Sequence, residues 1–390
     1  MHKSAVVAAV TFAFAATAFA HHGGGSFDLA RSVTYEGVLT KVELVNPHSW
    51  LYFDVTDANG KVSHHRCEMR SVHVLRRSGW NKEQFPVGKA ITVEAAPDKI
   101  DPNSCYLNTI RFKDGTHMDR YGQYVKGAGG ALTEVRGAVT TPDVASRPLR
   151  LPSGEPNITG DWAPEQVVMA NPRGTGGGLV PLSALKDIDA AGGPQARGGA
   201  GGRRGAPAGP RLYGGSELTD AGADAAAKFQ QMDNPRFHCE TTSIIFDWTF
   251  DGPVNRITQK SATIEILYGQ MGLKRTIYLN MKGHPRDVKP TRAGHSIGHW
   301  DGDTLVVDTE RFLPGVLNAP VRNSDQLHVV ERFTLDAKTM QLTRTYEADD
   351  PVYLKGIYKG KDVVGVADAP YTQDHCKEQG FINYSQQVKK

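Results

Sequence analysis

The second half of the chain consists of short segments rich in β-branched and aromatic residues, separated by glycine and aspartate turns. Apolar residues at every second position are typical of strands with one buried face. A regular series of such strands predicts an all-β fold, a lipocalin-like antiparallel β-barrel, with a β-sandwich as the alternative. The expected strands are residues 243–250, 254–259, 262–268, 274–280, 304–309, 327–335, 340–348 and 352–359.

Residues 32–125 form a smaller unit with the same alternation. Asn59-Gly60 indicates a hairpin, because this dipeptide favours turns with positive φ. About five strands in so short a unit predict a small OB-like β-barrel. Strands are expected at residues 32–39, 48–55, 90–95 and 108–113, with a helical or irregular segment at 72–77.

Composition divides the chain further. Of its 42 glycines, 14 fall within residues 172–215, which we expect to be a disordered loop. A helix is expected at residues 218–232, with Thr219 as its N-cap. The predicted order is a signal peptide at 1–20, the OB-like barrel at 21–125, a linker at 126–157 and the lipocalin-like barrel at 158–390.

The N-terminus has the features of a secretory signal. Lys3 is followed by an alanine-rich apolar stretch that ends in Ala18-Phe19-Ala20, a small-residue cleavage site. We therefore expect a periplasmic or secreted protein. Beyond this segment no apolar run is long enough for a membrane span, and a net charge of +3 does not indicate a nucleic-acid partner.

An oxidising compartment would favour disulfides among the four cysteines. Four cysteines allow three pairings, and the sequence alone does not choose between them. The domain layout favours Cys67 with Cys105 and Cys239 with Cys376, one pair in each domain.

Two groups of motifs resemble uncharacterised families of exported bacterial proteins. His21-His22 with Asn46-Pro47-His48-Ser49-Trp50 is similar to a family of small barrels, over residues 21–120. The block from Gly294 to Thr309, Gly-His-Ser-Ile-Gly-His-Trp-Asp-Gly-Asp-Thr-Leu-Val-Val-Asp-Thr, resembles a second family, over residues 158–378. At His299 that second family more often has arginine. Neither resemblance implies an activity.

A copper site is one hypothesis for the processed N-terminus. Cleavage after Ala20 would give His21 a free α-amino group, which can chelate Cu(II) together with the imidazole. His22 or His48 could supply a third nitrogen. The alternative is a solvated tail, because His21 and His22 precede three glycines.

The second half holds a histidine and carboxylate cluster. His295 is the candidate general base, with Asp308 and Glu331 as carboxylates that could orient it. We expect this cluster inside the barrel or at its mouth. The candidate ligand-binding residues are His284, His299, Trp300 and Asp303. The alternative is a structural role for these residues. Asp301 and Asp303 would then only form a hairpin turn, and His295 would be a structural residue whose hydrogen bonds are made within the protein.

These observations lead to three functional hypotheses. The first is an exported binding protein with a small organic ligand in the C-terminal barrel and copper at the N-terminus. The second is a cofactor-independent lyase, isomerase or hydrolase with a histidine base in that barrel. The third is a scaffold without a small-molecule site. The sequence names no partner protein, and it lacks the nucleophile elbow, P-loop and His-Glu-x-x-His motifs.

Overall fold

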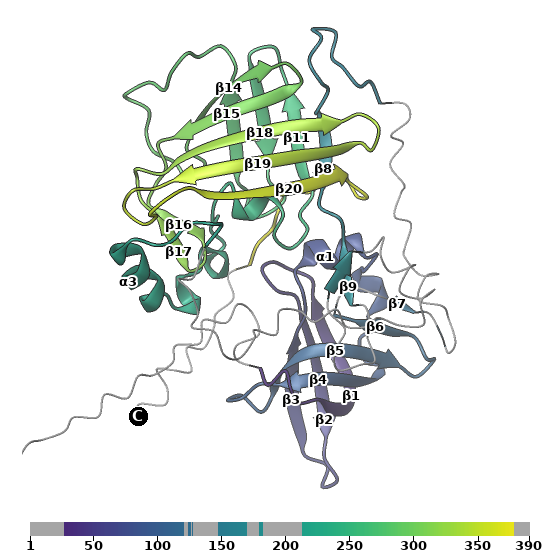
Figure 1. The fold of residues 1–390 in the computed structure, drawn as a ribbon. Helices are drawn as coiled ribbons and strands as arrows, with labels where there is room; N and C mark the ends of the chain where they lie inside the picture. The colour runs from purple at the N-terminus through teal and green to yellow at the C-terminus, as the bar shows by residue number, and fades with distance from the viewer. Residues whose placement is uncertain are drawn as a thin grey trace, which may run out of the picture.

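The computed structural model describes residues 27–120, 124–125, 127, 147–169, 179–181 and 213–377. Within them the chain forms two successive β-barrels, with the C-terminal barrel above the N-terminal one in Figure 1. The all-β fold with two barrels is confirmed. The predicted signal peptide and most of the predicted linker lie outside the described residues.

The N-terminal barrel has five strands and closes where β3 pairs in parallel with β5. Cys67 and Cys105 face each other at this closure and form a disulfide. Helix α1 (Val72–Arg77) and the 3-10 helix η1 (Lys82–Gln84) connect β3 to β4. The strands are β1 (Val33–Glu43), β2 (Trp50–Thr56), β3 (Val62–Glu68), β4 (Ala90–Pro97) and β5 (Ser104–Phe112), extended by β6 (His117–Asp119) and β7 (Tyr124–Val125).

The C-terminal barrel closes through nine strands of the described chain, because β8, before the long insertion, pairs with both β11 and β20. All neighbours are antiparallel except β13 and β14. The strands are β8 (Gly160–Ala163), β11 (Asn255–Gln259), β12 (Thr263–Leu267), β13 (Lys274–Tyr278), β14 (His295–Asp301), β15 (Thr304–Glu310), β18 (His328–Asp336), β19 (Gln341–Asp349) and β20 (Tyr358–Val366).

Shorter elements surround this barrel. Thr219 accepts a hydrogen bond from the Gly222 amide, so the predicted N-cap of α3 (Asp220–Lys228) is confirmed. The predicted disordered loop at 172–215 includes β10 (Leu179–Pro181), which pairs with β9 (Val167–Met169); residues 170–178 and 182–212 lie outside the described residues. The others are η3 (Gln231–Asp233), η4 (Pro235–His238), η5 (Phe246–Trp248), β16 (Gly315–Asn318) and β17 (Val321–Asn323).

The prediction of a strand at residues 243–250 is wrong. This segment contains η5 and is packed into the barrel, where Trp248 is fully buried. The Trp248 ring lies edge-on to Phe333 and Tyr268, at centroid distances of 5.9 and 5.7 Å. The Arg344 guanidinium donates hydrogen bonds to the carbonyls of residues 244 and 245. The segment therefore plugs the barrel and contributes no strand to its wall.

Charged side chains accompany this plug inside the barrel. Glu331 is 0% exposed and pairs with two arginines that are also buried, Arg275 at 2.5 Å and Arg344 at 3.2 Å. Arg344 also pairs with Asp362 at 2.5 Å. The barrel interior, where an organic ligand is expected from the sequence, holds the plug, apolar side chains and this ion-pair network.

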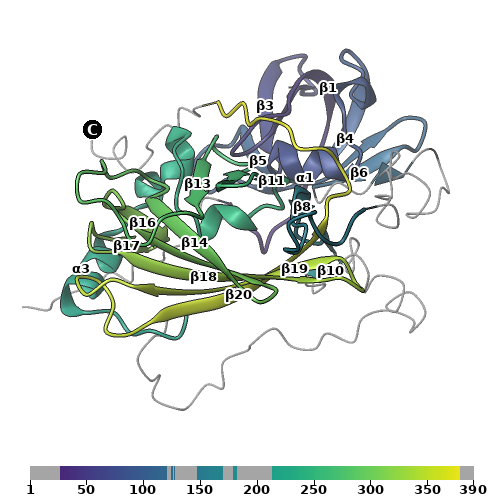
Figure 2. The same ribbon diagram turned by 90° about the horizontal axis from the view of Figure 1, so that it is seen from above.

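A C-terminal strap, residues 367–377, joins the two barrels. Figure 2 shows it in yellow, running from the C-terminal barrel along the N-terminal one. Asp368 accepts a hydrogen bond of 2.7 Å from Arg77 of α1, and Asp374 accepts one of 2.6 Å from Asn46. Cys376 forms a disulfide with Cys239, so both pairings suggested by the domain layout are confirmed.

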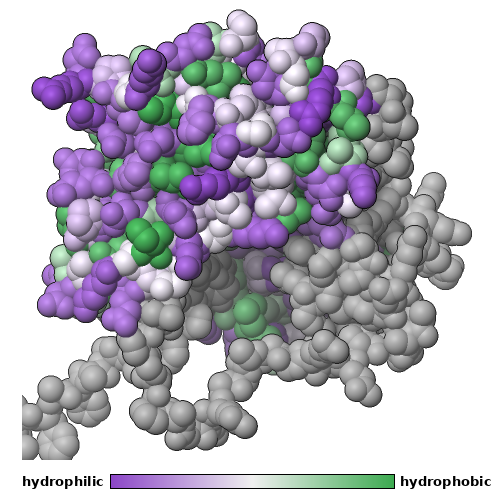
Figure 3. Space-filling view, turned by 45° about the horizontal axis from the view of Figure 1, so that its top comes forward, coloured by the Kyte–Doolittle hydropathy of each residue, from purple (hydrophilic) through white to green (hydrophobic). Residues whose placement is uncertain are grey.

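No helix among the described residues has both the length and the apolar character needed to cross a membrane. The molecular face drawn in Figure 3 is mostly hydrophilic, and its hydrophobic residues form small separate patches. Two disulfides agree with the expected oxidising compartment.

Asp247 in the plug gives a testable pH dependence. Its carboxylate is 0% exposed, and burial raises its pKa from 3.8 to about 7 although it accepts a hydrogen bond from the Thr242 amide. Between these pKa values the folded state binds the proton and the unfolded state does not, so stability falls as pH rises. From pH 4 to pH 8 the loss is expected to be on the order of 4 kcal/mol relative to Asp247→Asn.

Urea unfolding of both proteins at pH 4 and pH 8 measures this difference. Asp224→Asn, at an exposed position of α3, is the matched control and is expected to follow the wild type. Parallel pH profiles for the wild type and Asp247→Asn would contradict the assignment of a protonated, buried Asp247.

Candidate functional site

Polar side chains gather on the outer face of the C-terminal barrel where β15 ends and β18 begins. In β15 the buried residues Leu305, Val307 and Thr309 point inward, so the alternating residues Asp308 and Glu310 point outward. The outward position of these carboxylates follows directly from the two-residue period of the strand.

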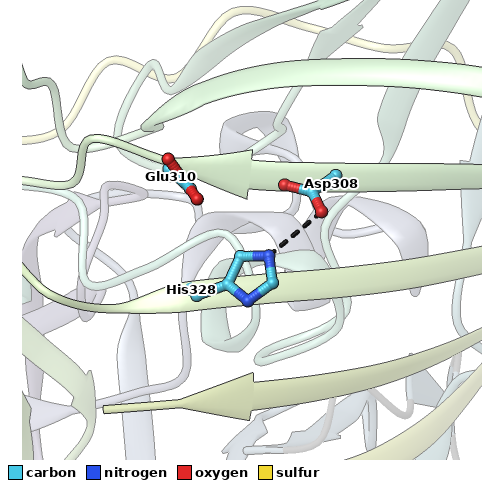
Figure 4. A group of neighbouring side chains, drawn as sticks. All are labelled: Asp308, Glu310 and His328. Carbon is cyan, nitrogen blue, oxygen red and sulfur yellow. Dashed lines mark hydrogen bonds and ion pairs between the residues drawn. The ribbon is translucent and has the colours of Figure 1, made fainter. Parts of the chain in front are cut away.

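The register of the neighbouring strands adds two histidines to this face. His295, the first residue of β14, pairs with Glu310. His328, the first residue of β18, lies beside the end of β15, because the next residue, Val329, pairs with Thr309. Figure 4 shows Asp308 and Glu310 on one strand and His328 on its neighbour. We call Asp308, Glu310 and His328 the rim cluster.

The geometry of the rim cluster is that of a metal-ligand set. One ligand atom from each of its three residues lies within 4.8 Å of the other two. The His328 Nε2 atom is 3.0 Å from Asp308 Oδ2, and both side chains are 39% exposed. Imidazole nitrogen with two carboxylates suits Zn²⁺, Fe²⁺ or Mn²⁺, and three protein ligands leave coordination positions open to solvent.

Two further histidines extend the cluster through hydrogen bonds. His284 lies in the connection between β13 and β14, with its Nε2 atom 2.9 Å from Asp308 Oδ1. Its Nδ1 atom is 2.8 Å from His295 Nδ1, and the His295 ring stacks on Tyr278 at 5.2 Å. His284 and His328 thus hold opposite oxygens of Asp308, which fixes the orientation of this carboxylate.

The electrostatics agree with these contacts. The hydrogen bond from His328, with a further one from His284, lowers the pKa of Asp308, so its carboxylate stays ionised. The same hydrogen bond to Asp308 raises the pKa of His328. Burial lowers the pKa of His295, and the neighbouring His284 lowers it further.

The three predicted catalytic residues do not come together. His295 and Asp308 lie on the outer face of the barrel, whereas Glu331 points inward and pairs with arginines. The barrel wall separates them, because Asp308 pairs with Val330, and the next residue of β18 faces the opposite side. Of the two expected placements, inside the barrel or at its mouth, the structure does not show the first for His295, which lies at the start of β14 with its ring stacked on Tyr278 of the outer face.

The predicted ligand-binding residues are also divided. Of these four residues, only His284 contacts the rim cluster, through its hydrogen bond with Asp308. His299 is exposed near the far end of β14, and Trp300 packs against the barrel core. Asp303 lies in the turn after β14 and forms an exposed ion pair of 2.7 Å with Arg150.

The predicted copper ligands are not assembled by the described residues. His21 and His22 lie outside them. His48 lies at the junction between the barrels, where its Nδ1 atom is 3.1 Å from Glu68 and its ring contacts Phe237. The copper hypothesis therefore stays a prediction.

Sequence reasoning missed Glu310 and His328. Both lie at strand ends, and the alternation of β15 gave a usable signal, because Asp308 and Glu310 are two residues apart after an apolar run. The contribution of His328 depends on the pairing of β15 with β18, which the sequence does not show. Elsewhere, a groove of about 440 Å³ beside Asp161, Arg256 and Val366 is lined by none of the predicted site residues.

Comparison with known proteins covers only the N-terminal part. Residues 9–104 match the model of DUF6152, a family of unknown function. No curated protein matches the chain, and no solved structure does. The N-terminal match agrees with a resemblance to an uncharacterised family, while the resemblance of residues 158–378 stays a prediction. The rim cluster lies outside the matched residues, so its function has to be argued from its geometry.

Proposed function

We propose that the protein is an exported binding protein whose C-terminal barrel holds a divalent transition-metal ion at the rim cluster. The observation that carries the proposal is the convergence of the Asp308, Glu310 and His328 ligand atoms within 4.8 Å. Metal–ligand bonds of about 2.0–2.2 Å bring ligand atoms about 3–4 Å apart, so small side-chain movements would suffice.

The surroundings of the cluster support this proposal. The His284 imidazole holds the second oxygen of Asp308, as outer partners of metal-binding carboxylates commonly do. All three candidate ligands are partly exposed, so an ion could reach them from solvent. The strands β15 and β18 provide a rigid base, because both belong to the closed barrel.

Isothermal titration of chelator-treated protein with Zn²⁺ tests the proposal. Every protein in the series carries His21→Ala and His22→Ala, which removes any metal site at the N-terminus. One Zn²⁺ per chain is expected. His328→Ala or Glu310→Ala is expected to weaken the affinity at least about 100-fold, and His284→Ala about 10- to 100-fold.

His299→Ala is the matched control, because His299 is an exposed histidine on the neighbouring strand β14, away from the cluster. It is expected to change the affinity less than twofold. Equal zinc affinity in His328→Ala, Glu310→Ala and the control would overturn the proposal.

A cofactor-independent enzyme remains the alternative, and one observation favours it. The contact of 2.8 Å between the Nδ1 atoms of His284 and His295 orients the His295 ring, and no described residue forms a hydrogen bond with its Nε2 atom. Turnover by chelator-treated protein that is lost in His295→Ala and kept in Glu310→Ala would favour this enzyme over the metal site.

A further inference from the structure

The connection that carries His284 is strongly basic. Residues 281–292 contain four basic residues and a single acidic one, Asp287. Arg292 reaches Glu240, at 3.5 Å. Lys282, Arg286 and Lys289 are exposed, and within the described chain none of them has an ion-pair partner. We call residues 281–292 the basic loop.

His284 fixes the basic loop beside the rim cluster. Lys282 and Arg286 lie two residues before and after His284, whose Nε2 atom is 2.9 Å from Asp308 Oδ1. Both residues are therefore only two positions along the chain from a side chain that contacts the cluster. A divalent ion would neutralise the carboxylates of Asp308 and Glu310, and the unpaired cations would then give the site a positive potential.

Apolar surface lies next to these charges. Tyr278 is 38% exposed and stacks on His295, the first residue of β14. Met281, at the start of the basic loop, is also 38% exposed. An aromatic ring and a flexible thioether side chain beside a charged centre can accommodate the apolar body of an organic molecule.

We infer that the metal-loaded rim cluster binds a small organic anion. Its carboxylate or phosphate group occupies an open coordination position of the metal and interacts with Lys282 and Arg286, while its apolar body contacts Tyr278 and Met281. This inference rests on the proposed metal site. The organic ligand of the C-terminal barrel would then bind on the outer face of the barrel wall. The site would recognise this ligand by its negatively charged head group.

Cobalt(II) substitution provides the test, because its visible spectrum reports a change of ligand at the metal. The full chain with His21→Ala and His22→Ala is loaded with Co²⁺ and titrated with benzoate, phenyl phosphate, acetate and inorganic phosphate. Benzoate or phenyl phosphate is expected to change the spectrum and to bind more tightly than acetate or inorganic phosphate. The better of the two aromatic probes identifies a carboxylate or a phosphate as the preferred head group.

The double variant Lys282→Ala/Arg286→Ala tests the basic loop. It is expected to weaken binding of the better probe about five- to tenfold at low salt, with a smaller effect at high salt. Lys113→Ala/Lys338→Ala removes the same charge at exposed positions away from the cluster and is expected to change binding less than twofold. Met281→Ala is expected to weaken phenyl phosphate more than inorganic phosphate.

Cobalt affinity is measured in parallel for each variant, so the two proposals can fail separately. Loss of probe binding with unchanged cobalt binding in Lys282→Ala/Arg286→Ala supports the inference. The inference is overturned if cobalt binds but none of the four probes changes its spectrum. It is also overturned if the two double variants bind the better probe with equal affinity. Absence of cobalt binding to the rim cluster overturns the proposed function itself.

Discussion

Substitution of Glu331 by alanine is expected to destabilise the C-terminal barrel by about 3–5 kcal/mol. The carboxylate is 0% exposed and lies between Arg275, at 2.5 Å, and Arg344, at 3.2 Å. Arg344 would keep Asp362, but Arg275 has no other ion-pair partner among the described residues. Removal of one partner from a buried ion pair leaves a desolvated charge, which costs more than the pair contributed. Urea unfolding, monitored by tryptophan fluorescence, to which the buried Trp248 contributes, measures the loss.

Glu347→Ala is the control for this substitution. Glu347 is exposed on β19, and its removal is expected to change stability by less than about 0.5 kcal/mol. Glu331→Gln is expected to leave zinc affinity unchanged, because the barrel wall separates Glu331 from the rim cluster. If Glu331→Ala and the control had equal unfolding free energies, the claim that Glu331 balances the charge of buried arginines would be contradicted. A loss of zinc affinity in Glu331→Gln would contradict the separation by the wall.

Removal of the disulfide between Cys239 and Cys376 is expected to have the second large effect. The two residues are 137 positions apart, and the chain-entropy model assigns about 5 kcal/mol to closure of so long a loop. Cys239→Ser/Cys376→Ser should therefore lower the unfolding midpoint strongly. It should also release the end of the strap, whose Lys377 amide donates a hydrogen bond to the Asn46 carbonyl.

Thermal unfolding and limited proteolysis measure these two consequences. The strap of the double variant should be cleaved faster than that of the wild type, because its covalent anchor is lost. Lys377→Ala, which removes only an exposed ion pair of 2.9 Å with Glu43, is the control and should behave like the wild type. Equal melting temperatures and equal cleavage rates would contradict a role of this disulfide in holding the strap.

Much of the fold could be predicted from the sequence, because strand alternation and domain layout are local or coarse signals. The alternation of apolar and polar residues predicted both barrels, and the division into two domains predicted both disulfides. The closure of each barrel could not be predicted in this way. In the C-terminal barrel it depends on β8, which is separated from β11 by the glycine-rich insertion.

The segment at 243–250 shows why apolar alternation is ambiguous. Ile244, Phe246 and Trp248 occupy alternate positions, as they would in a half-buried strand. In the structure, Phe246 and Trp248 belong to a 3-10 helix, and the carbonyls of residues 244 and 245 accept hydrogen bonds from Arg344. A short apolar run can be buried both as a strand and as a 3-10 helix. Long-range packing against the barrel determines which of the two forms.

The candidate site was predictable only in part. His284, His295 and Asp308 are polar residues close together in sequence, and the structure brings His284 into contact with each of the other two. Recognition of His328, and not Glu331, as the neighbour of Asp308 requires the register of β15 with β18, because a shift by one residue exchanges the two faces of a strand. Sequence patterns show that a strand has two faces, but they do not show which face meets a neighbouring cluster.

Anomalous X-ray diffraction at the zinc absorption edge tests the central claim most directly. Crystals of the chain with His21→Ala and His22→Ala, soaked in Zn²⁺, are expected to show an anomalous peak bounded by Asp308, Glu310 and His328, at about 2.0–2.2 Å from their ligand atoms. The same crystals of His328→Ala should lack this peak. A strong peak elsewhere in the molecule, with none at the rim cluster, would contradict the account.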